Sequence, residues 1–268
     1  MYTYRMTVSY DGTRYRGWQR QQNTGQTVQS VIERELGRVL GERVQIQGSG
    51  RTDSGVHAFA QEASLKLREE IDAGKVQDEL NCQLPEDIRV LRLQRVQNGF
   101  HARKSAAAKC YEYYVDLQEK PEVFTRRYTF HFPYRIDLPA MREAAEQLRG
   151  RYDCTSFTDL TDSEDTVRTI YRIEITKTGE KLKMSFYGDG FLYHMVRILA
   201  GTLLDVGAGK IPASQIPAIR DAKDRKWSGF PAPAKGLFLK RVYYSREELE
   251  EDMKLPGAEQ IAERVRIF

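Results

Sequence analysis

The sequence predicts an α+β fold, and three observations favour it. Alternating polar and apolar residues, typical of strands, are separated by stretches with helical spacing. The first hundred residues give a regular order of strand, helix, strand, strand, helix and strand. The second half gives a similar but less regular order. A length of 268 residues suits one large or two medium domains. The two halves are therefore candidates for an ancient duplication, although no residue-level repeat is visible.

The first half supplies the clearest elements. Residues 2–10 are rich in Tyr, Thr and Val and are expected to form a strand. A helix is expected to begin at Thr27, because the apolar residues after it fall on one stripe: Val28, Val31, Ile32, Leu36, Val39 and Leu40. The other expected elements are strands at about 43–47, 58–67 and 88–96 and a helix at about 72–82. This order is that of the ferredoxin-like split βαβ arrangement.

The second half supplies a comparable set. A strand is expected at 109–117 and a helix at 139–148. A hairpin of 168–176 with 181–187 is expected to turn at Thr178-Gly179. The later elements expected are a helix at 191–206, a short helix at 213–222 and a strand at 237–244. The acidic segment from Ser245 is expected to be a solvated helix and a partly ordered tail, with no assigned function.

The charge balance excludes a whole-molecule polycation. There are 42 basic and 38 acidic residues, which leaves a net charge of +4. Nucleic-acid binding would therefore depend on local basic patches. Three such patches occur, at Arg14–Arg20, at Arg103, Lys104 and Lys109, and at Lys223–Lys226. The first interleaves cations with aromatic residues, which suits phosphates and exposed bases.

Cysteine usage and hydropathy indicate a soluble, cytoplasmic protein. Cys82, Cys110 and Cys154 are far apart, and an odd count without Cys-x-x-Cys spacing argues against both disulfides and zinc. No stretch approaches the ~18 apolar residues of a membrane span, and no apolar leader is visible at the N-terminus. Neither a metal nor a nucleotide cofactor is signalled by any motif.

The most informative segment is Gly48–Ala58, a glycine-rich loop between two expected strands. It presents the Asp53 carboxylate beside the Arg51 guanidinium, which can pair with that acid or with a phosphate. Glycines at 48, 50 and 55 permit positive φ and close approach of another molecule. The arrangement is typical of a shaped loop that displays one acid at a strand end.

Three other interpretations of this loop compete. Thr-Asp-Ser-Gly can be an ordinary turn, since Asp and Gly are common turn residues. A glycine-rich phosphate cradle fails on spacing, because Asp53 stands where the third glycine is needed. Asp53-Ser54-Gly55 also matches the triplet of aspartic proteases, but those enzymes need two such carboxylates. This chain has one copy, so a protease would require a homodimer.

With its flanks, the loop resembles the tRNA pseudouridine synthase A family, whose signature is close to Gly-x-Gly-Arg-Thr-Asp-x-Gly-Val-His-Ala. Three further blocks match in order: Tyr10–Thr13 with Gly17–Gln21 and Thr27–Gln29, then Phe100–Arg103 with Ser105-Ala106, Lys109, Tyr111 and Tyr113, then Gly190–Arg197 running into Gly201–Leu204. Together the matches extend from residue 4 to about residue 244. Four ordered blocks are a far more specific signal than one.

The chain departs from the family pattern in several places. The loop 227–234 follows the small-residue and Thr-Ala-Pro-Ala pattern only loosely. Ile198 stands where many members carry Asn, and Cys154 replaces a usual aromatic residue. The residues after Ser245 match nothing in the family pattern. These differences affect substrate contacts and position choice more than the reaction.

The resemblance implies a fold and a function. The fold is two ferredoxin-like (RRM-like) α/β domains with antiparallel sheets joined side by side and the active-site cleft between them. The implied domains are residues 1–103, residues 104–245 and a tail at 246–268. The implied function is cofactor-independent isomerisation of uridine to pseudouridine at positions 38–40 of the tRNA anticodon stem-loop, by a homodimer. A non-catalytic RNA-binding protein of the same fold is the alternative.

The resemblance also implies residue roles. Asp53 is the catalytic carboxylate, Tyr111 stacks on the uracil or takes the proton lost at C5, and Arg197 pairs with Asp53. Arg51 fills the space vacated by the everted base or holds its phosphate. The basic patches described above, and not the resemblance, add expected substrate contacts at Arg14, Arg16, Arg20 and Arg103. His57, His101 and His194 are expected to be structural.

Overall fold

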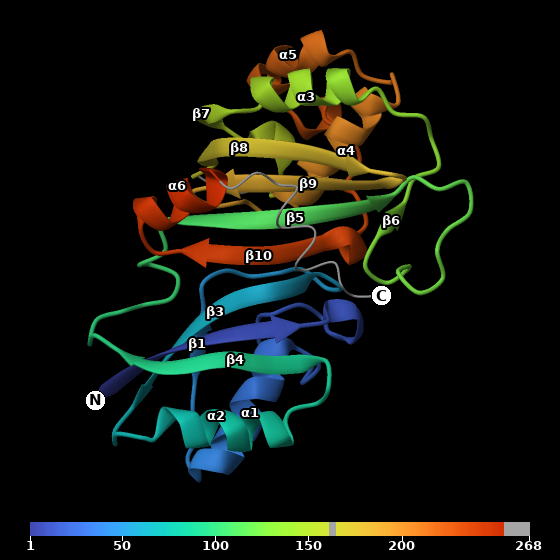
Figure 1. Ribbon diagram of the computed structural model, residues 1–268. Coiled ribbons are helices and arrows are strands. Elements are labelled where there is room, and N and C mark those ends of the chain that lie inside the picture. The colour runs from blue at the N-terminus through green and yellow to red at the C-terminus, as the bar shows by residue number, and fades with distance from the viewer. Residues whose placement is uncertain (161–164, 255–268) are drawn as a thin grey trace. The chain divides into compact units, whose positions relative to one another are not determined.

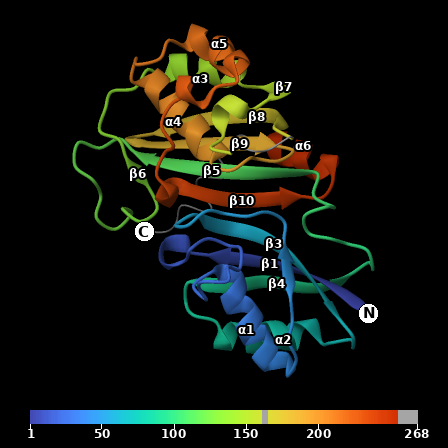
Figure 2. The ribbon, with the colours of Figure 1, turned by 180° about the vertical axis from the view of Figure 1, so that it is seen from behind.

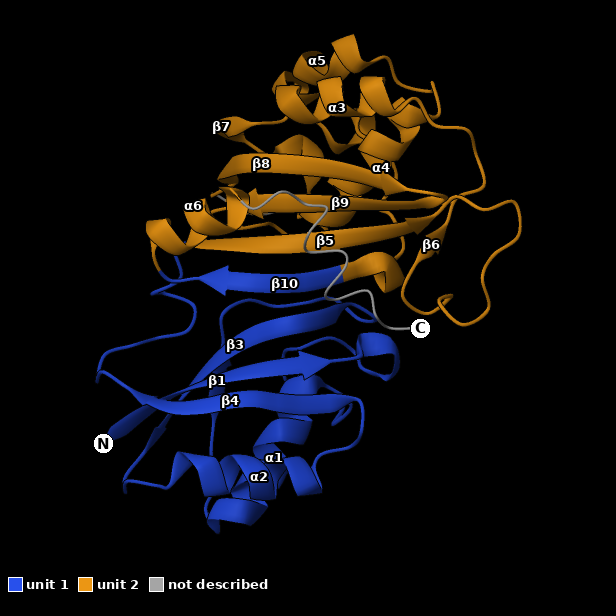
Figure 3. Cartoon of the chain, in the orientation of Figure 1, with its two compact units in different colours: residues 1–107, 238–244 blue, residues 108–237, 245–268 orange. Residues whose placement is uncertain are grey.

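The computed structural model describes residues 1–160 and 165–254, which form two compact units. Unit 1 comprises residues 1–107 and 238–244, and unit 2 comprises the rest of the described chain (Figure 3). The sequence prediction drew its boundary at residue 103 and kept 238–244 with the C-terminal half. The two divisions therefore differ mainly in the placement of one late strand.

Unit 1 follows the predicted order of strands and helices (Figure 1). Its elements are β1 (Tyr2–Tyr10), α1 (Val28–Leu40), β2 (Ile46–Gly48), β3 (His57–Leu67), α2 (Ala73–Gln83), β4 (Ile88–Val96) and most of β10 (Leu237–Tyr243). Antiparallel pairing places β1 between β4 and β3, and β2 pairs with β3. The late strand β10 runs parallel to β3, with Phe238 opposite His57.

Local chemistry explains these elements. Tyr4, Met6 and Val8 alternate with less buried residues along β1 and are fully buried, so one face of the sheet forms the core. The Thr27 side chain accepts a hydrogen bond from the Ser30 amide and caps α1, which ends at Gly41 in a left-handed conformation. Helices α1 and α2 contact each other and lie on one face of the unit 1 sheet (Figures 1 and 2).

Unit 2 is likewise built of strands and helices. Its elements are β5 (Ala108–Asp116), β6 (Phe130–His131), α3 (Leu138–Gln147), β7 (Gly150–Asp153), β8 (Val167–Thr178), β9 (Lys181–Gly188), α4 (Met195–Gly207), α5 (Ile216–Ala222) and α6 (Arg246–Lys254). The strand order is β5-β9-β8-β7, with the short β6 beside β5. Helices α3 and α4 contact each other on one face, and α6 lies on the other (Figures 1 and 2).

The two units share a strand pattern, and the predicted α+β class is confirmed. In unit 1 the first strand neighbours the third, with the second on its far side, in the order β1-β3-β2. In unit 2 the long strands repeat this order as β5-β9-β8. A helix follows the first strand in both units. The last strand in the sequence, β10, belongs almost wholly to unit 1 and not to unit 2.

Three details of the prediction were wrong. The helix expected from Phe191 begins at Met195, because His194 has φ of 59° and so cannot lie within a right-handed helix. The strand expected at 43–47 forms at Ile46–Gly48. The helix α6 is not simply solvated, since Leu249 is buried and the Met253 carbonyl accepts a hydrogen bond from Arg172. The expected tail at 255–268 lies outside the described residues.

Candidate active site

Asp53 sits on a tight loop between β2 and β3. The Val56 amide donates to the Asp53 carbonyl at 3.1 Å, and Gly55 adopts φ of +78°, which favours glycine. Asp53 is half-buried, whereas the neighbouring Thr52 is buried. The loop is therefore a closed turn with its acid at the margin of the core.

The segment after β1 holds this loop by its backbone. The Trp18 amide donates to the Thr52 carbonyl at 3.1 Å, and the Gly55 amide donates to the Tyr15 carbonyl at 3.3 Å. The approach is so close that only glycine fits. A Cβ on Gly12 would lie 1.9 Å from the Val56 oxygen, and one on Gly17 would lie 2.5 Å from the Thr52 oxygen. Two separate sequence blocks thus form one structural feature.

A buried polar contact completes the support beneath Asp53. The hydroxyls of Tyr10 and Thr52 lie 2.7 Å apart inside the unit. Burial raises the pKa of Tyr10, although its hydrogen bond to Thr52 acts in the opposite direction, so the phenol stays neutral. The Trp18 indole packs on Gly48, where a Cβ would lie 2.3 Å from the indole nitrogen. The loop cannot shift without disturbing this packing.

Tyr111 lies on β5 in unit 2, opposite Phe186 of β9. Its side chain is only 7% exposed, and its ring meets the edge of Phe191 with centroids 5.4 Å apart at 85°. Tyr113 alternates onto the same face, as expected for a strand, and donates its hydroxyl to the Pro233 carbonyl at 2.8 Å. Both tyrosines are thus packed against segments that surround the start of α4.

Arg197 lies in the first turn of α4 and is bound to the loop 228–234. Its Nε donates to the Ala232 carbonyl at 2.7 Å, while the Ala232 amide donates to the Arg197 carbonyl at 2.9 Å. Tyr113 is close enough for the Arg197 charge to act on it. Burial raises the pKa of Tyr113 and outweighs the opposing effect of that charge. The guanidinium is therefore oriented through one of its nitrogens.

Glycines bring this loop onto the helix. A Cβ on Gly201 of α4 would lie 1.8 Å from the Phe230 oxygen. Conversely, a Cβ on Gly229 would lie 2.7 Å from the Thr202 backbone, and the Gly229 amide donates to the Thr202 hydroxyl at 2.9 Å. The loop that departs from the family pattern in sequence is thus tightly fixed in structure.

The start of α4 is clamped by one carboxylate. His194, in its left-handed conformation, has its Nδ1 2.6 Å from an Asp159 oxygen, and Arg225 donates to the other oxygen at 2.8 Å. Burial alone would raise the pKa of Asp159, but the hydrogen bonds from His194 and Arg225 outweigh it and hold that pKa below its usual value. Asp159 therefore stays ionised at neutral pH and ties three segments together.

A sequence profile of the family described as "tRNA pseudouridine synthase" matches residues 6–103 and 144–245. The chain belongs to this family.

Curated relatives named tRNA pseudouridine synthase A match this chain over almost their whole length. A tRNA pseudouridine synthase A from Bacillus subtilis is 46% identical over 89% of this chain and 97% of its own. One from Bacillus pumilus is also 46% identical, over the same shares of both chains. One from Acetivibrio thermocellus is 41% identical over 90% of this chain and 98% of its own. A solved Cbf5-Nop10-Gar1 complex matches with a TM-score of 0.40 at 12% identity, over 88% of this chain and 48% of that chain, which is too low to support an argument.

The pseudouridine synthase match covers some predicted site residues and not others. Asp53, Arg51 and Arg197 lie within the matched ranges, whereas Tyr111 lies in the unmatched stretch 104–143. Asp53 and Arg51 belong to unit 1, while Tyr111 and Arg197 belong to unit 2. Within unit 2, Tyr111 packs on Phe191, which lies four residues before α4, and Arg197 in the first turn of α4 binds Ala232.

The arginines predicted to contact tRNA differ in their surroundings. Arg14 forms two hydrogen bonds to an Asp87 oxygen, at 2.8 and 2.6 Å, and Arg20 pairs with Glu33 at 3.1 Å. Arg16, Arg51 and Arg103 are exposed, and none forms an ion pair with any residue in 1–160 or 165–254. These three guanidiniums are therefore the more available to a polyanion. Of the third basic patch, Lys223 pairs with Asp153 at 3.1 Å.

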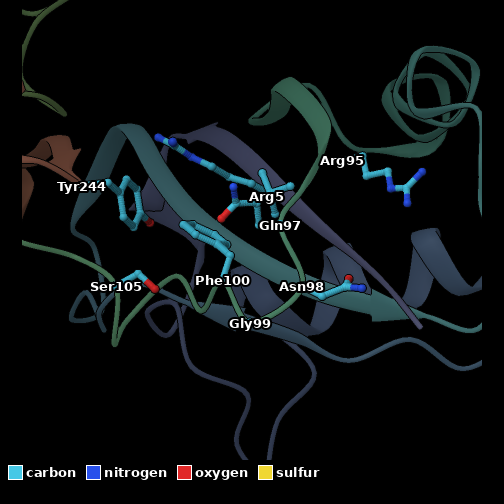
Figure 4. Close-up of a pocket in the computed structure, with 9 residues that line it drawn as sticks. Arg5, Arg95, Gln97, Asn98, Gly99, Phe100, Ser105 and Tyr244 are labelled. Atoms are coloured by element: carbon cyan, nitrogen blue, oxygen red, sulfur yellow. The ribbon is translucent and has the colours of Figure 1, made fainter.

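A shallow groove of about 970 Å³ lies on unit 1 around Phe100 and Tyr244 (Figure 4). The Arg5 guanidinium lies 4.3 Å from the Tyr244 ring centroid and forms a two-pronged ion pair with Glu62, at 2.8 and 3.1 Å. Arg95 also lines the groove, but its side chain points away from the aromatic pair (Figure 4). Phe100 also packs on Tyr244, with ring centroids 5.0 Å apart. These contacts hold the segment after β4 against the sheet.

Sequence reasoning missed the residues that position the site. These are the Ala232 carbonyl, the Asp159 carboxylate and the close approaches at Gly12, Gly17 and Gly201. The glycines were visible within the matched blocks. A glycine inside a helix, such as Gly201 in α4, could have indicated a close backbone contact.

No three His, Cys, Asp or Glu side chains in the described ranges lie together as a metal site would require, and no helix there is long and apolar enough to cross a membrane.

Proposed function

We propose that this protein converts uridine to pseudouridine in the anticodon stem-loop of tRNA, at positions 38–40. The observation that carries the proposal is the family match across both halves of the chain, with Asp53 on a loop fixed by its backbone. The reaction breaks the C1′–N1 bond and forms a C1′–C5 bond. One proton leaves C5 and one is gained at N1, so atoms and electrons balance without a cofactor.

Asp53 is the carboxylate of this reaction. A carboxylate at the target nucleoside can add to the ribose or the base, or it can assist elimination at C1′. All three routes need an ionised acid held in one place. The backbone hydrogen bonds from the segment Tyr15–Trp18 to the loop supply that fixed position.

Arg197 and Tyr111 act beside it. Arg197 pairs with Asp53 and keeps it ionised, and its Nε bond to Ala232 orients the remaining nitrogens for that task. Tyr111 stacks on the uracil or takes the proton lost at C5. Its position against Phe191 gives the ring one fixed orientation. Arg51, exposed and without an ion pair in the described ranges, occupies the space left by the everted base.

The experiment replaces the acid without changing its shape. Asp53→Asn should lower pseudouridine formation in unmodified tRNA at least about 1,000-fold, as expected for loss of a group that acts on the reacting atoms. Asp78→Asn is the matched control, because Asp78 is exposed on α2 and the same charge is lost. Pseudouridine is mapped by carbodiimide-dependent reverse-transcription stops.

The same experiment separates the competing functions. A wild-type protein that binds tRNA without forming pseudouridine is an RNA-binding protein, and the enzyme proposal then fails. Asp53→Asn with undiminished activity would remove the mechanism but leave the activity. Stops outside positions 38–40 would replace the proposed target uridines.

The proposal includes a homodimer working in the cytoplasm. One subunit would hold the body of the tRNA while the other presents its site. Sedimentation with and without tRNA gives the oligomeric state directly. A single monomeric species at concentrations that support full activity would contradict the dimer without affecting the proposed reaction.

A further inference from the structure

Two large aromatic side chains are exposed beside the start of α4. Tyr193 is 49% exposed and Trp227 is 63% exposed. Tyr193 precedes His194, and Trp227 lies two residues after Arg225. Asp159 binds both His194 and Arg225. Exposed aromatic side chains that lie together are candidates for an interaction site.

Tyr193 is held in a fixed orientation. Its carbonyl accepts a hydrogen bond from the Thr158 hydroxyl at 2.9 Å. Its ring stacks on the His194 imidazole with centroids 3.7 Å apart, and that imidazole is bound to Asp159. One face of the phenol ring is thus covered by an anchored neighbour.

The backbone that carries Trp227 is fixed by hydrogen bonds. It ends a short 3₁₀ turn, Arg225–Trp227, in which Asp224 accepts hydrogen bonds from the Lys226 amide at 2.9 Å and the Trp227 amide at 3.2 Å. Arg225 then binds the Ser228 hydroxyl at 3.0 Å and the Gly229 carbonyl at 2.9 Å. Little backbone entropy is therefore lost when this turn binds a partner.

The charged groups near these rings include two cations, Arg225 and Lys226, and two carboxylates, Asp159 and Asp224. Asp159 is matched by Arg225 and His194. Lys226 is exposed and forms no ion pair with any residue that the structure describes. The surface therefore presents two aromatic rings and an available ammonium group, which is the combination that binds unpaired nucleotides.

We propose that Tyr193 and Trp227 form a stacking platform for unpaired nucleotides of the substrate RNA next to the target uridine. The inference rests on the proposed function and names a further contact surface for it. The location follows from the chain: His194 immediately precedes α4, and the Trp227 segment continues to Ala232, which binds Arg197. Stacking of this kind tolerates any base, which suits an enzyme acting on several neighbouring positions.

Tryptophan fluorescence tests the platform directly. The chain has two tryptophans, and Trp18 is only 1% exposed, so quenching by a bound base reports on Trp227. An anticodon stem-loop RNA should quench the emission of the wild-type protein. A fully base-paired hairpin of equal length should quench it much less. The quenching should disappear in Trp227→Phe.

Binding and activity measurements complete the test. Trp227→Ala should raise the Kd and KM for tRNA by roughly 10-fold, as expected for the loss of one stacked base. Trp227→Phe should restore most of that affinity, and the salt dependence of binding should not change. Lys226→Gln should instead reduce the salt dependence by about one counterion. Phe124→Ala is the matched control, because Phe124 is 76% exposed elsewhere on unit 2.

The outcomes are distinguishable. If the wild type forms pseudouridine while Trp227→Ala binds tRNA as well as Phe124→Ala does, the platform is overturned and the proposed function stands. If Trp227→Ala weakens self-association and leaves RNA affinity unchanged, the surface binds a second copy of the chain and the inference fails. If the wild type forms no pseudouridine, the proposed function itself fails.

Discussion

The loop of Asp53 and the first turn of α4 are positioned by different means. The Asp53 loop is held by backbone groups, chiefly amides and carbonyls exchanged with residues 15–18. The start of α4 is held by side chains: Arg197 on Ala232, and His194 and Arg225 on Asp159. The first arrangement fixes an acid whose location matters, and the second fixes a cation whose orientation matters.

Both regions nevertheless depend on glycines that let two backbones touch. Gly12 and Gly17 serve the Asp53 loop, and Gly201 and Gly229 serve α4. Backbone contacts of this kind cannot be relaxed by rotating a side chain, whereas the side-chain bonds around α4 can be exchanged for others. The comparison therefore predicts that substitutions at the Asp53 loop are the more damaging.

The largest effect is expected from Gly12→Ala. The new Cβ would lie 1.9 Å from the Val56 oxygen, so the loop must move. We expect a loss of at least about 3 kcal/mol in the free energy of unfolding, at the upper end for overpacking, and loss of activity. Urea unfolding gives the stability. Gly25→Ala, which meets nothing within 4 Å, is the control, and equal stability of the two variants would refute the close approach.

Gly201→Ala should rank second. Alanine normally stabilises a helix interior by about 1 kcal/mol relative to glycine, but here its Cβ would lie 1.8 Å from the Phe230 oxygen. We expect a net destabilisation of about 2 kcal/mol. Gly74→Ala in α2 has only an ordinary 3.5 Å contact and should be neutral or slightly stabilising. The same sign for both variants would contradict this account of how the 228–234 loop packs.

Thiol labelling shows which unit opens in these variants. Cys82 is exposed in unit 1, while Cys110 and Cys154 are buried in unit 2. Burial raises the pKa of Cys154 to about 12, so its thiolate is scarce at neutral pH. Native protein should label at Cys82 alone. Gly201→Ala should accelerate labelling of the two buried thiols more than Gly12→Ala does, and the reverse order would contradict the assignment of each glycine to its unit.

A smaller stability effect is expected from Arg197→Lys. Lysine keeps the charge but lacks the planar Nε that binds Ala232. Stability should fall by about 1 kcal/mol, typical of one hydrogen bond, and kcat by roughly 10- to 100-fold through misplacement of the cation. Arg151→Lys, at an exposed position of unit 2, is the matched control. Unchanged kcat would mean that charge alone is sufficient at this position.

The smallest effect concerns Asp159→Asn and depends on pH. The pKa of Asp159 is lowered in the folded protein, so its contribution to stability is present above its unfolded pKa, near 4, and is lost as the pH falls through the folded value. Asp159→Asn should therefore be less stable than wild type by up to about 1 kcal/mol at pH 7. The two should converge in acid. Thermal unfolding across pH 2–7 measures the difference, and a constant gap would exclude this linkage.

Local patterns predicted the fold well where one segment decides the outcome. Thr27 and the apolar stripe after it located α1, and alternation located β1 and β4 to the residue. The hairpin of β8 and β9 was found through Gly179, which adopts a positive φ. Prediction failed at His194, because a left-handed residue other than glycine is stabilised by Asp159, which lies 35 residues away.

The candidate site also contains residues that motifs could predict and contacts that they could not. Asp53, Tyr111 and Arg197 were predicted from motifs, and their roles stay predictions. The ion pair of Arg14 with Asp87 joins residues 73 positions apart, so no local pattern could reveal that this cation has a partner within the protein. The placement of β10 also depends on a distant contact, since Phe238 stacks on His57 and Phe59.

The late arrival of β10 has a consequence for synthesis on the ribosome. A nascent chain that has emerged through residue 107 holds all of unit 1 except β10, which pairs with the first residues of β3. At 5–20 residues per second, emergence of residues 108–237 takes on the order of ten seconds. Throughout that interval the rings of His57 and Phe59 lack Phe238, and the start of β3 at His57 and Ala58 is open to wrong partners. The N-terminal half thus begins to fold first and is among the last parts to be completed.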